Sequence, residues 1–447
     1  MQIPENPPDF IQMFKDNSDV VKELLKPEVR NLVDKSIREY PYWSKFKYWQ
    51  MPAGLTPEIA WVLREFLAIG ERKNIPLRDT KSQLFSYWLP DSAQETLHNI
   101  DRQNPGEKSF TGEIPSPQER DRYIVSSLME EAIASSQIEG AATTRRVAKE
   151  MLRTGRPPAN KSEKMILNNY RAMERLRELK KHPLTLEVLN ELHVILTEGT
   201  LDDEAASGRL RQSPKDDDVC VYDDENNIIH RPPNGDELPA RLDVFLKFAN
   251  DEDSRHFIHP VVKAILLHFW IGYIHPYVDG NGRTARAVFY WYLLRKGYWL
   301  FEFVSLSRMV LRAWKQYARA FVYSERAGND VTYFIMFNLQ AIQLAVGEVH
   351  RYINKKQAEI NQAATLLRGV DDFNRRQREL LLDALRKPGR IYSIYNHQKI
   401  HSISYQSART DLLDLVAKKL FHVSKSGKTH EFMAVNNLRE LIDAKNQ

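Results

Sequence analysis

A short segment, residues 275–286, combines a histidine, a carboxylate and two arginines with small, turn-forming residues: His-Pro-Tyr-Val-Asp-Gly-Asn-Gly-Arg-Thr-Ala-Arg. The small residues at 279–282 allow backbone N–H groups to approach a ligand closely. We expect a helix to begin at about Arg283, which directs its positive end at the same place. Arg283 and Arg286 lie three residues apart on one helical face. Each adds a guanidinium group that can donate two parallel hydrogen bonds to a phosphate. The segment therefore predicts a phosphate site, in which Asp279 is suited to hold a magnesium ion.

His275 is the candidate general base of this segment. A histidine side chain has an ordinary pKa near 6.5 and is therefore largely neutral at pH 7. Beside bound phosphates, His275 can then accept a proton from an incoming hydroxyl group. Each feature alone has a simpler interpretation, with residues 279–282 as a tight turn and His275 as a helix end. Their combination in one segment favours the chemical interpretation.

The elements that must position this segment are mainly helical. An apolar stretch from Val261 to Ile274 predicts a buried helix that ends at His275, because Pro276 stops it. Lysine and histidine interrupt the stretch, which argues against a membrane span. Helical spacing dominates from about residue 119 to 355, so we expect a mainly α fold.

One exception is the segment 218–233, which predicts two short strands joined by a polar turn. A lone hairpin among helices is not stable by itself. It therefore either packs on the helices or pairs with an extended peptide, and the residues alone leave both interpretations open.

Length and turn residues suggest about three folding units. Residues 1–115 predict a helical domain rich in aromatic residues, and the turn-rich loop at 103–117 marks its end. Residues 116–355 form the expected catalytic core. Residues 371–447 predict three helices followed by a basic hairpin, which is typical of a winged helix.

Composition excludes some classes of protein and leaves the partner open. The 64 basic and 59 acidic residues give a net charge of +5, too small for a dedicated nucleic-acid binder. Cys220 is the single cysteine, so neither an intrachain disulfide nor a cysteine-rich metal site is expected. The N-terminus has no signal-peptide pattern, and we expect a soluble, cytoplasmic protein without membrane contact. A metal cluster is disfavoured because no carboxylate stands at zinc-ligand spacing beside the nearby histidines His256, His259, His268 and His275.

Residues 275–286 resemble the complete signature of the Fic family, a histidine followed by an acidic-Gly-Asn-Gly-Arg-x-x-Arg core. Tyr277 stands where the family more often has phenylalanine, which keeps an aromatic anchor. A looser resemblance spans about 119–341 and includes Gly208-Arg-Leu-Arg211. It implies a helical core and a protein adenylyltransferase, which transfers AMP from ATP to a Ser, Thr or Tyr hydroxyl of a target protein or of itself. The family's kinase-like branch carries lysine in place of Gly282, so nucleotidyl transfer is favoured here.

The resemblance also implies a role for individual residues. His275 would activate the target hydroxyl, and Asp279 would bind Mg²⁺. The hairpin at 218–233 would serve as a flap that aligns the target backbone beside the nucleotide. The implied nucleotide-binding residues are Gly280, Asn281, Gly282, Arg283, Thr284, Ala285 and Arg286, with Ile228 and Ile229 of the flap.

A second motif precedes the core, where a helix at about 121–140 ends in Ser135-Ser-Gln-Ile-Glu139-Gly140. By itself, Glu139 is a surface residue near a helix end. Beside a Fic core, Ser135 and Glu139 resemble the family's inhibitory signature, in which the glutamate pairs with the last arginine, here Arg286, and keeps the γ-phosphate from its productive position. In some relatives the same carboxylate positions water that removes AMP, and the sequence leaves both roles open.

A rival hypothesis is a DNA-binding regulator built on residues 371–447. Residues near the start of the expected recognition helix and in the wing would contact DNA, whereas Asp411 and Asp414 argue against tight binding. A protein-docking module is an equally open interpretation. The target protein is not determined by the sequence, and a homodimer is among the assemblies left open. The residues proposed to contact DNA are Tyr405, Gln406, Arg409, Lys425 and Lys428.

Overall fold

The computed structural model describes residues 3–16, 18–104, 117–222, 225–252, 256–368, 372–426 and 429–445. The chain forms two compact units, of which the first contains the described residues up to Val349 and the second those from His350 onward. The fold is mainly α-helical with small antiparallel sheets, which confirms the expected fold class. None of the helices in the described ranges has the length and apolar character needed to cross a membrane.

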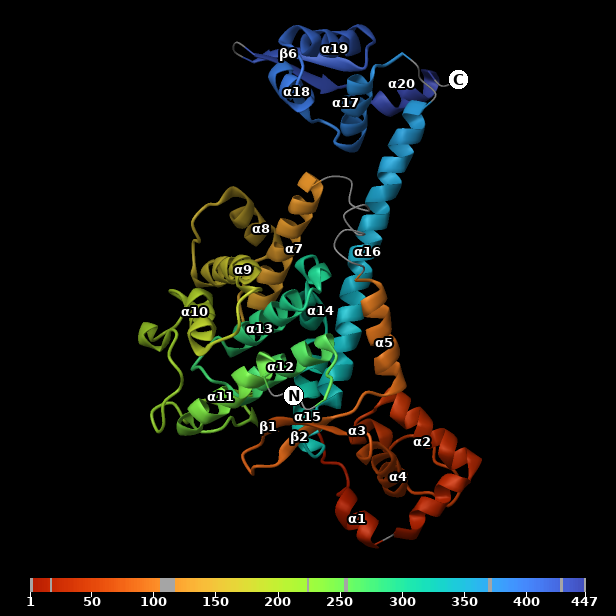
Figure 1. Ribbon diagram of the computed structural model, residues 1–447, viewed down its shortest axis with the longest axis vertical. Coiled ribbons are helices and arrows are strands. Elements are labelled where there is room, and N and C mark those ends of the chain that lie inside the picture. Colours follow the sequence, from red (N-terminus) through yellow and green to blue (C-terminus); the bar gives the residue numbers. More distant parts are fainter. Residues whose placement is uncertain are drawn as a thin grey trace. The chain divides into compact units, whose positions relative to one another are not determined.

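The first unit contains most of the helices (Figure 1). Its two small sheets pair β1 (Lys73–Arg78) with β2 (Leu84–Tyr87), and β3 (Val221–Tyr222) with β4 (Ile228–His230). The helices and 3-10 turns are α1 (Phe10–Asp16), η1 (Ser18–Leu25), α2 (Pro27–Glu39), α3 (Trp43–Phe46), α4 (Pro57–Ile69), α5 (Asp91–Arg102), α7 (Pro117–Ile138), α8 (Arg145–Thr154), α9 (Lys161–Leu179), α10 (Leu186–Thr197), η2 (Glu204–Ala206), η3 (Gly235–Glu237), α11 (Leu238–Ala249), α12 (Pro260–Ile274), α13 (Asn281–Arg295), η4 (Trp299–Glu302), α14 (Leu306–Arg312), α15 (Trp314–Arg326) and α16 (Thr332–Arg368).

Helices α12 and α13 form the centre of the first unit. Their side chains are buried on nearly every face, and α7, α9 and α10 pack against α13 (Figure 1). Helix α12 begins where the sequence predicts, because Pro260 fits the first turn and His259 accepts a hydrogen bond from the Val261 N–H. A helix surrounded by other elements has no polar face, which is why both sequences lack the usual amphipathic pattern.

The N-terminal residues, which we expected as a separate domain, pack within this same unit. Buried polar groups join them to the start of α16: the Tyr40 hydroxyl donates to Asp330 at 2.6 Å, and Arg64 donates to the Tyr333 hydroxyl at 3.0 Å. Arg72 also forms an ion pair with Asp330 at 3.1 Å. Buried charges that lose their partners are strongly destabilising, so these contacts hold the two segments together. Most of the loop expected as the boundary, 105–116, lies outside the described residues.

The N-terminal region, expected to be helical, also contains one β-hairpin that the sequence analysis did not predict, formed by β1 and β2. This hairpin buries Ile75, Leu77 and Phe85, and Ser86 pairs through its backbone with residues 329 and 331 before α16. Pro76 inside β1 removes a backbone donor and weakens the strand pattern in the sequence. Backbone pairing with residues 329 and 331, which are distant in the sequence, stabilises the hairpin. A short stretch of sequence around the hairpin gives no sign of this pairing.

The second unit consists of helices around a three-stranded sheet with the order β5-β7-β6. Its buried core contains Leu381, Leu412, Leu415 and Phe432. An Asn374–Gln377 capping box starts its first complete helix. The elements are α17 (Arg375–Arg386), β5 (Ile391–Ser393), α18 (Ile394–His401), α19 (Tyr405–Ala417), β6 (Phe421–Ser426), β7 (Thr429–Ala434) and α20 (Leu438–Lys445), preceded by the end of α16.

Because its core is built from its own residues, a fragment spanning residues 372–447 should fold alone. We expect a cooperative thermal transition monitored by circular dichroism and a dispersed amide NMR spectrum. Leu412→Ala should lower the free energy of unfolding by about 2–5 kcal/mol, since Leu412 is fully buried. Arg375→Ala, a change at a side chain that is 92% exposed, is the control and should have little effect. A broad, non-cooperative transition would contradict an independent unit.

Candidate active site

The turn between α12 and α13 carries the residues singled out in the sequence. His275 ends α12 in the left-handed conformation, with φ 47°, and Gly280 precedes α13 with φ 82°. A Cβ at Gly280 would lie 2.8 Å from Thr197 Cγ2, so both conformation and space require glycine there. Helix α13 begins at Asn281, two residues before the expected start at Arg283.

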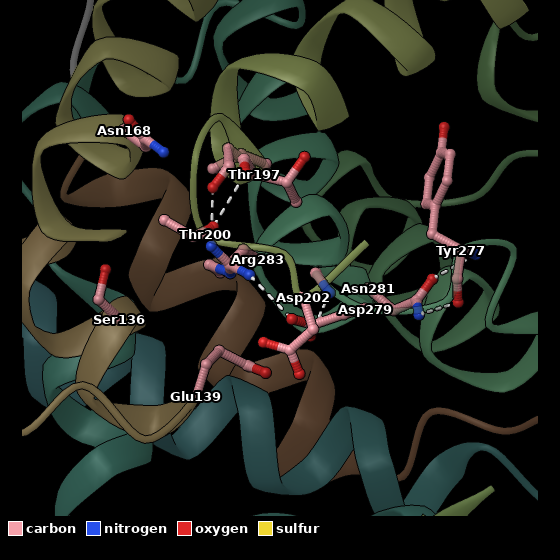
Figure 2. Close-up of polar contacts among 12 residues, drawn as sticks. Ser136, Glu139, Asn168, Thr197, Thr200, Asp202, Tyr277, Asp279, Asn281 and Arg283 are labelled. Atoms are coloured by element: carbon pink, nitrogen blue, oxygen red, sulfur yellow. Dashed lines mark hydrogen bonds and ion pairs between the residues drawn. The ribbon is translucent and has the colours of Figure 1, made fainter. Parts of the chain in front are cut away.

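Hydrogen bonds within the turn fix its shape. The Asn281 side chain accepts from the Tyr277 N–H at 2.9 Å and donates to the Tyr277 carbonyl at 2.7 Å (Figure 2). The Tyr277 hydroxyl donates to Asn190 at 2.7 Å. Tyr277 thus acts as the buried anchor of the turn, while Asn281 holds the loop closed rather than facing a ligand with both of its polar atoms.

Arg211 holds the carbonyl groups at the end of α12. Its side chain donates to the carbonyls of His275 at 2.6 Å, Pro233 at 2.7 Å and Ile274 at 3.2 Å. One buried guanidinium therefore ties the catalytic turn to the segment that follows β4. The sequence singled out this arginine only as part of the motif at 208–211, without a role.

His193, which the sequence analysis did not single out, supports the turn from α10. Its ring stacks on Tyr277 with centroids 3.7 Å apart. Nδ1 accepts from the Gly208 N–H at 2.9 Å, so in the neutral ring Nε2 carries the hydrogen and donates to the Asp279 carbonyl at 2.8 Å. Burial lowers the pKa of His193 to about 4, which keeps this arrangement at neutral pH.

The hydrogen bonding of His275 leaves one ring nitrogen available as a base. Nδ1 lies 2.8 Å from the Gly272 carbonyl, which can only accept, so Nδ1 carries the hydrogen and Nε2 keeps its lone pair. Burial lowers the pKa of His275 to about 4, despite the opposing effect of the Gly272 carbonyl. The imidazole is therefore neutral throughout the physiological range.

A cavity of about 420 Å³ lies beside this turn, a size usual for small-molecule sites. His275, Asp279 and the first residues of α13 form one side of it, and flap residues and α15 form others. The predicted residues that line it are Glu139, Ile229, His275, Asp279, Gly280, Asn281, Gly282, Ala285 and Arg286.

Glu139 and Arg286 meet at this cavity, as the sequence analysis expected. Arg286 Nη2 donates to Glu139 Oε1 at 2.8 Å, and Arg286 Nε donates to the Ser135 hydroxyl at 2.8 Å. Arg286 is buried, whereas the Glu139 side chain is 23% exposed. A Cβ at Gly282 would lie 2.2 Å from the Glu139 carboxylate, so the carboxylate lies directly over the start of α13.

The structure separates other residues that the sequence grouped together. Arg283 does not line the cavity; its side chain is buried, donates to the Leu196 carbonyl at 2.7 Å and lies 3.7 Å from Asp279 (Figure 2). Thr284 is also buried and donates to the Gly280 carbonyl. Ile228 lines a neighbouring depression, together with Arg231 and Arg326, rather than this cavity.

The flap consists of β3 and β4, which are shorter than the predicted strands. It packs on the helices through His230, whose ring lies 2.9 Å from the Glu325 carboxylate and 2.7 Å from the Tyr273 carbonyl. Both neighbours accept hydrogen bonds, and the Glu325 carboxylate raises the pKa of His230 against the effect of burial. The flap is thereby fixed to α12 and α15.

Helix α15 supplies cavity residues that the sequence analysis missed. Trp314, Tyr317 and Phe321 line the cavity. They follow the motif by about 30 residues and show only a helical pattern, so no local signal connects them with the site. In the described part of the chain, no group of three or more His, Cys, Asp and Glu residues is placed to hold a metal ion. His268 instead bonds the Tyr317 hydroxyl in the aromatic core.

Comparisons with known proteins agree with this geometry. Residues 183–293 match the model of the Fic/DOC family. Protein adenylyltransferase Fic of Drosophila melanogaster is 42% identical over 69 residues, which cover 15% of this chain and 14% of the relative. The protein of the same name from Drosophila mojavensis matches equally. The matched segment thus spans about a seventh of these curated relatives.

A solved structure of Fic-1 from C. elegans has a TM-score of 0.52 at 17% identity and covers 79% of this chain and 90% of that one. At this identity the likeness shows the fold alone. It extends well beyond the residues matched by the family model. The matching family model identifies residues 183–293, which include the turn between α12 and α13, as a Fic/DOC-family domain within this chain.

Proposed function

We propose that this protein is an adenylyltransferase that moves AMP from ATP to a hydroxyl side chain of a target protein, and to itself. The observation that carries the proposal is the neutral His275, with its Nε2 lone pair, in the same cavity as the amide-rich start of α13. The curated relatives that match this segment are named protein adenylyltransferases.

The proton transfer follows from the state of His275. Nε2 accepts the proton of the target hydroxyl as its oxygen attacks the α-phosphorus of ATP. The new bond joins this oxygen to phosphorus, the bond to the bridging oxygen of the β-phosphate breaks, and pyrophosphate leaves. The low pKa keeps the base available, and proximity to the bound substrate supplies much of the acceleration.

The start of α13 is suited to the phosphates. The first intrahelical bond runs from the Thr284 N–H to the Gly280 carbonyl, so the amides of residues 281–283 have no acceptor within the helix. Arg286 adds a guanidinium group at the cavity, while Arg283 contributes its charge from behind the turn. Backbone amides and a helix N-terminus favour a negatively charged ligand.

The residues present also fit a magnesium ion, which in phosphoryl-transfer sites neutralises charge on the phosphates. Asp279 would hold it: its side chain is 58% exposed beside the cavity, and carboxylate oxygen is a preferred ligand of magnesium. Asp279 Oδ1 accepts from the Gly280 N–H, which orients the carboxylate at the start of α13.

The flap is proposed to bind the backbone of the target. Val221 and Tyr222 of β3 and Ile229 of β4 line the cavity wall. A short strand with a free edge can pair with an extended peptide, and this places a side-chain hydroxyl beside the nucleotide. His230 would hold the flap in position during this pairing.

We further propose that Glu139 inhibits the enzyme by occupying Arg286. A guanidinium paired with a carboxylate and bonded to Ser135 is not available for a terminal phosphate, and the carboxylate over Gly282 repels negative charge. Removal of AMP through water positioned by Glu139 is the second role proposed for this residue.

His275→Ala should abolish transfer of AMP while ATP binding remains nearly intact, because the base is lost but the amides and Arg286 remain. The measurement is incorporation of label from α-labelled ATP, together with the mass of the modified protein. His182→Ala, a change at an exposed histidine, is the control and should keep full activity. Normal transfer by the His275 variant would contradict its role as base.

Asp279→Ala should weaken the dependence on magnesium together with the rate, because it removes the proposed ligand. The measurement is the initial rate as a function of magnesium concentration at fixed ATP. Asp243→Ala, at a side chain that is 62% exposed on α11, is the matched control. An unchanged magnesium titration in the Asp279 variant would count against its role.

Glu139→Gly should raise AMP incorporation by roughly a hundredfold, since a partly buried ion pair of about 3 kcal/mol would be removed. Arg286→Ala should not show this increase, because it removes a phosphate ligand along with the partner of Glu139, and the double variant should resemble it. Glu130→Gly is the control: Glu130 lies on α7, the helix that precedes Glu139, but pairs with Arg145 and Lys149. Equal rates in wild type and the Glu139 variant would refute inhibition by this pair.

A further inference from the structure

The net positive charge of the chain lies in the second unit. Residues 372–447 contain 14 Lys and Arg but 8 Asp and Glu, a net charge of +6 within a chain whose total is +5. The rest of the protein is therefore nearly neutral. A small net charge for the whole chain conceals a distinctly basic unit, and this excess favours a polyanionic partner.

Helix α19 has one face in the core and one face in solvent. The core face carries Ala408, Leu412 and Leu415, all fully buried. The exposed face carries Tyr405, Gln406, Arg409 and Thr410 at helical spacing. These exposed residues include no acidic side chain.

The two acidic residues of α19 that seemed to oppose DNA binding are both paired within the unit, Asp411 as a buried side chain and Asp414 as a partly exposed one. Asp411 is buried and accepts from Arg376 at 2.7 Å, and it also bonds Asn374 and His397. Asp414 accepts from Gln377 at 2.7 Å and from Lys418 at 2.8 Å. Because both charges are matched by partners within the unit, we infer that they oppose DNA binding less than the sequence alone suggests.

Several basic residues of the unit are already paired, and others are not. Arg376, Lys387, Arg390 and Lys418 each form an ion pair with a nearby acid. Within the described ranges, Lys399, Arg409 and Lys425 form no such pair, and all three are exposed. They come from α18, α19 and β6 respectively, so three neighbouring elements present free positive charge.

We propose that the second unit is a winged helix that binds double-stranded DNA, with α19 in the major groove and the β6–β7 hairpin as the wing. The 13 residues of α19 make a helix about 20 Å long, which the major groove can admit. Helix α19 packs against β6, so the hairpin lies beside it (Figure 1). Gln406 and Arg409 are of the types that bind adenine and guanine edges, and Lys425 is placed to contact phosphate.

Unpaired cations on three neighbouring elements, together with base-binding residue types on the exposed face of α19, favour DNA over an acidic protein as the partner. The proposal rests on the second unit alone. It is independent of AMP transfer, so either function can fail in experiment while the other holds.

The test is fluorescence anisotropy of a labelled 30-base-pair duplex of mixed sequence, titrated with the full chain between 50 and 300 mM salt. We expect binding that weakens steeply with salt, because phosphate contacts release counterions. Arg409→Gln should weaken binding about tenfold and lower the salt slope by about one. Arg409→Lys keeps the charge, so it should retain the slope and bind more tightly than the glutamine variant.

Arg375→Gln is the matched control. It makes the same charge change at an exposed position of α17, outside the proposed contact face, and should change affinity less than twofold. Absence of binding at 50 mM salt by the folded chain would overturn the proposal and favour protein docking. Equal losses from the Arg409 and Arg375 variants would also overturn it, because binding would then depend on net charge and not on the face of α19.

Discussion

The turn between α12 and α13 depends on one constraint: many of its backbone polar groups are enclosed by protein, because both helices that it joins are buried on nearly every face. Each carbonyl and amide near the turn must find a partner inside the protein. Arg211, Asn281 and His193 supply these partners, and each comes from or reaches a different element. What remains without an intrahelical partner is the row of amides at the start of α13, directed at the cavity. The proposed phosphate site thus follows from how completely the other polar groups of the turn are hydrogen-bonded.

The same reasoning applies to the charge of Arg286. A guanidinium removed from water needs close acceptors, since burial without them is very costly. Ser135, on α7, and Glu139, directly after the end of α7, provide these acceptors. Two kinds of group, an internal carboxylate and a terminal phosphate, would satisfy the arginine equally well in chemical terms. Competition between them is the physical basis of the inhibition that we propose for Glu139.

Charge is distributed unequally between the two units. The first unit carries the turn proposed to be catalytic, yet its overall charge is close to zero, and the proposed anion site depends on local amides and on Arg286 rather than on a basic surface. The second unit has the excess of positive charge, and its acids are paired on the inner side of α19. Backbone amides at a helix N-terminus are suited to bind the phosphates of a small nucleotide. Exposed basic side chains distributed over a surface are suited to bind a long polyanion.

The sequence by itself determined the features that rest on local rules. The end of α12 at Pro276, the glycines of the turn and the helical character of most of the chain follow from proline geometry, glycine conformation and residue periodicity, which act within a few residues. The resemblance of 275–286 to a known signature identified the family and the candidate base.

Only the tertiary structure decided which way each side chain faces and what lies opposite. Arg283 and Arg286 look equivalent in the sequence, but packing of α10 turns the first toward Leu196, while α7 brings Ser135 and Glu139 to the second. The contribution of α15 to the cavity and the inward direction of Asp411 are likewise long-range results. They depend on contacts between segments distant in the chain, whose energies leave no periodic or compositional trace in a local stretch of sequence.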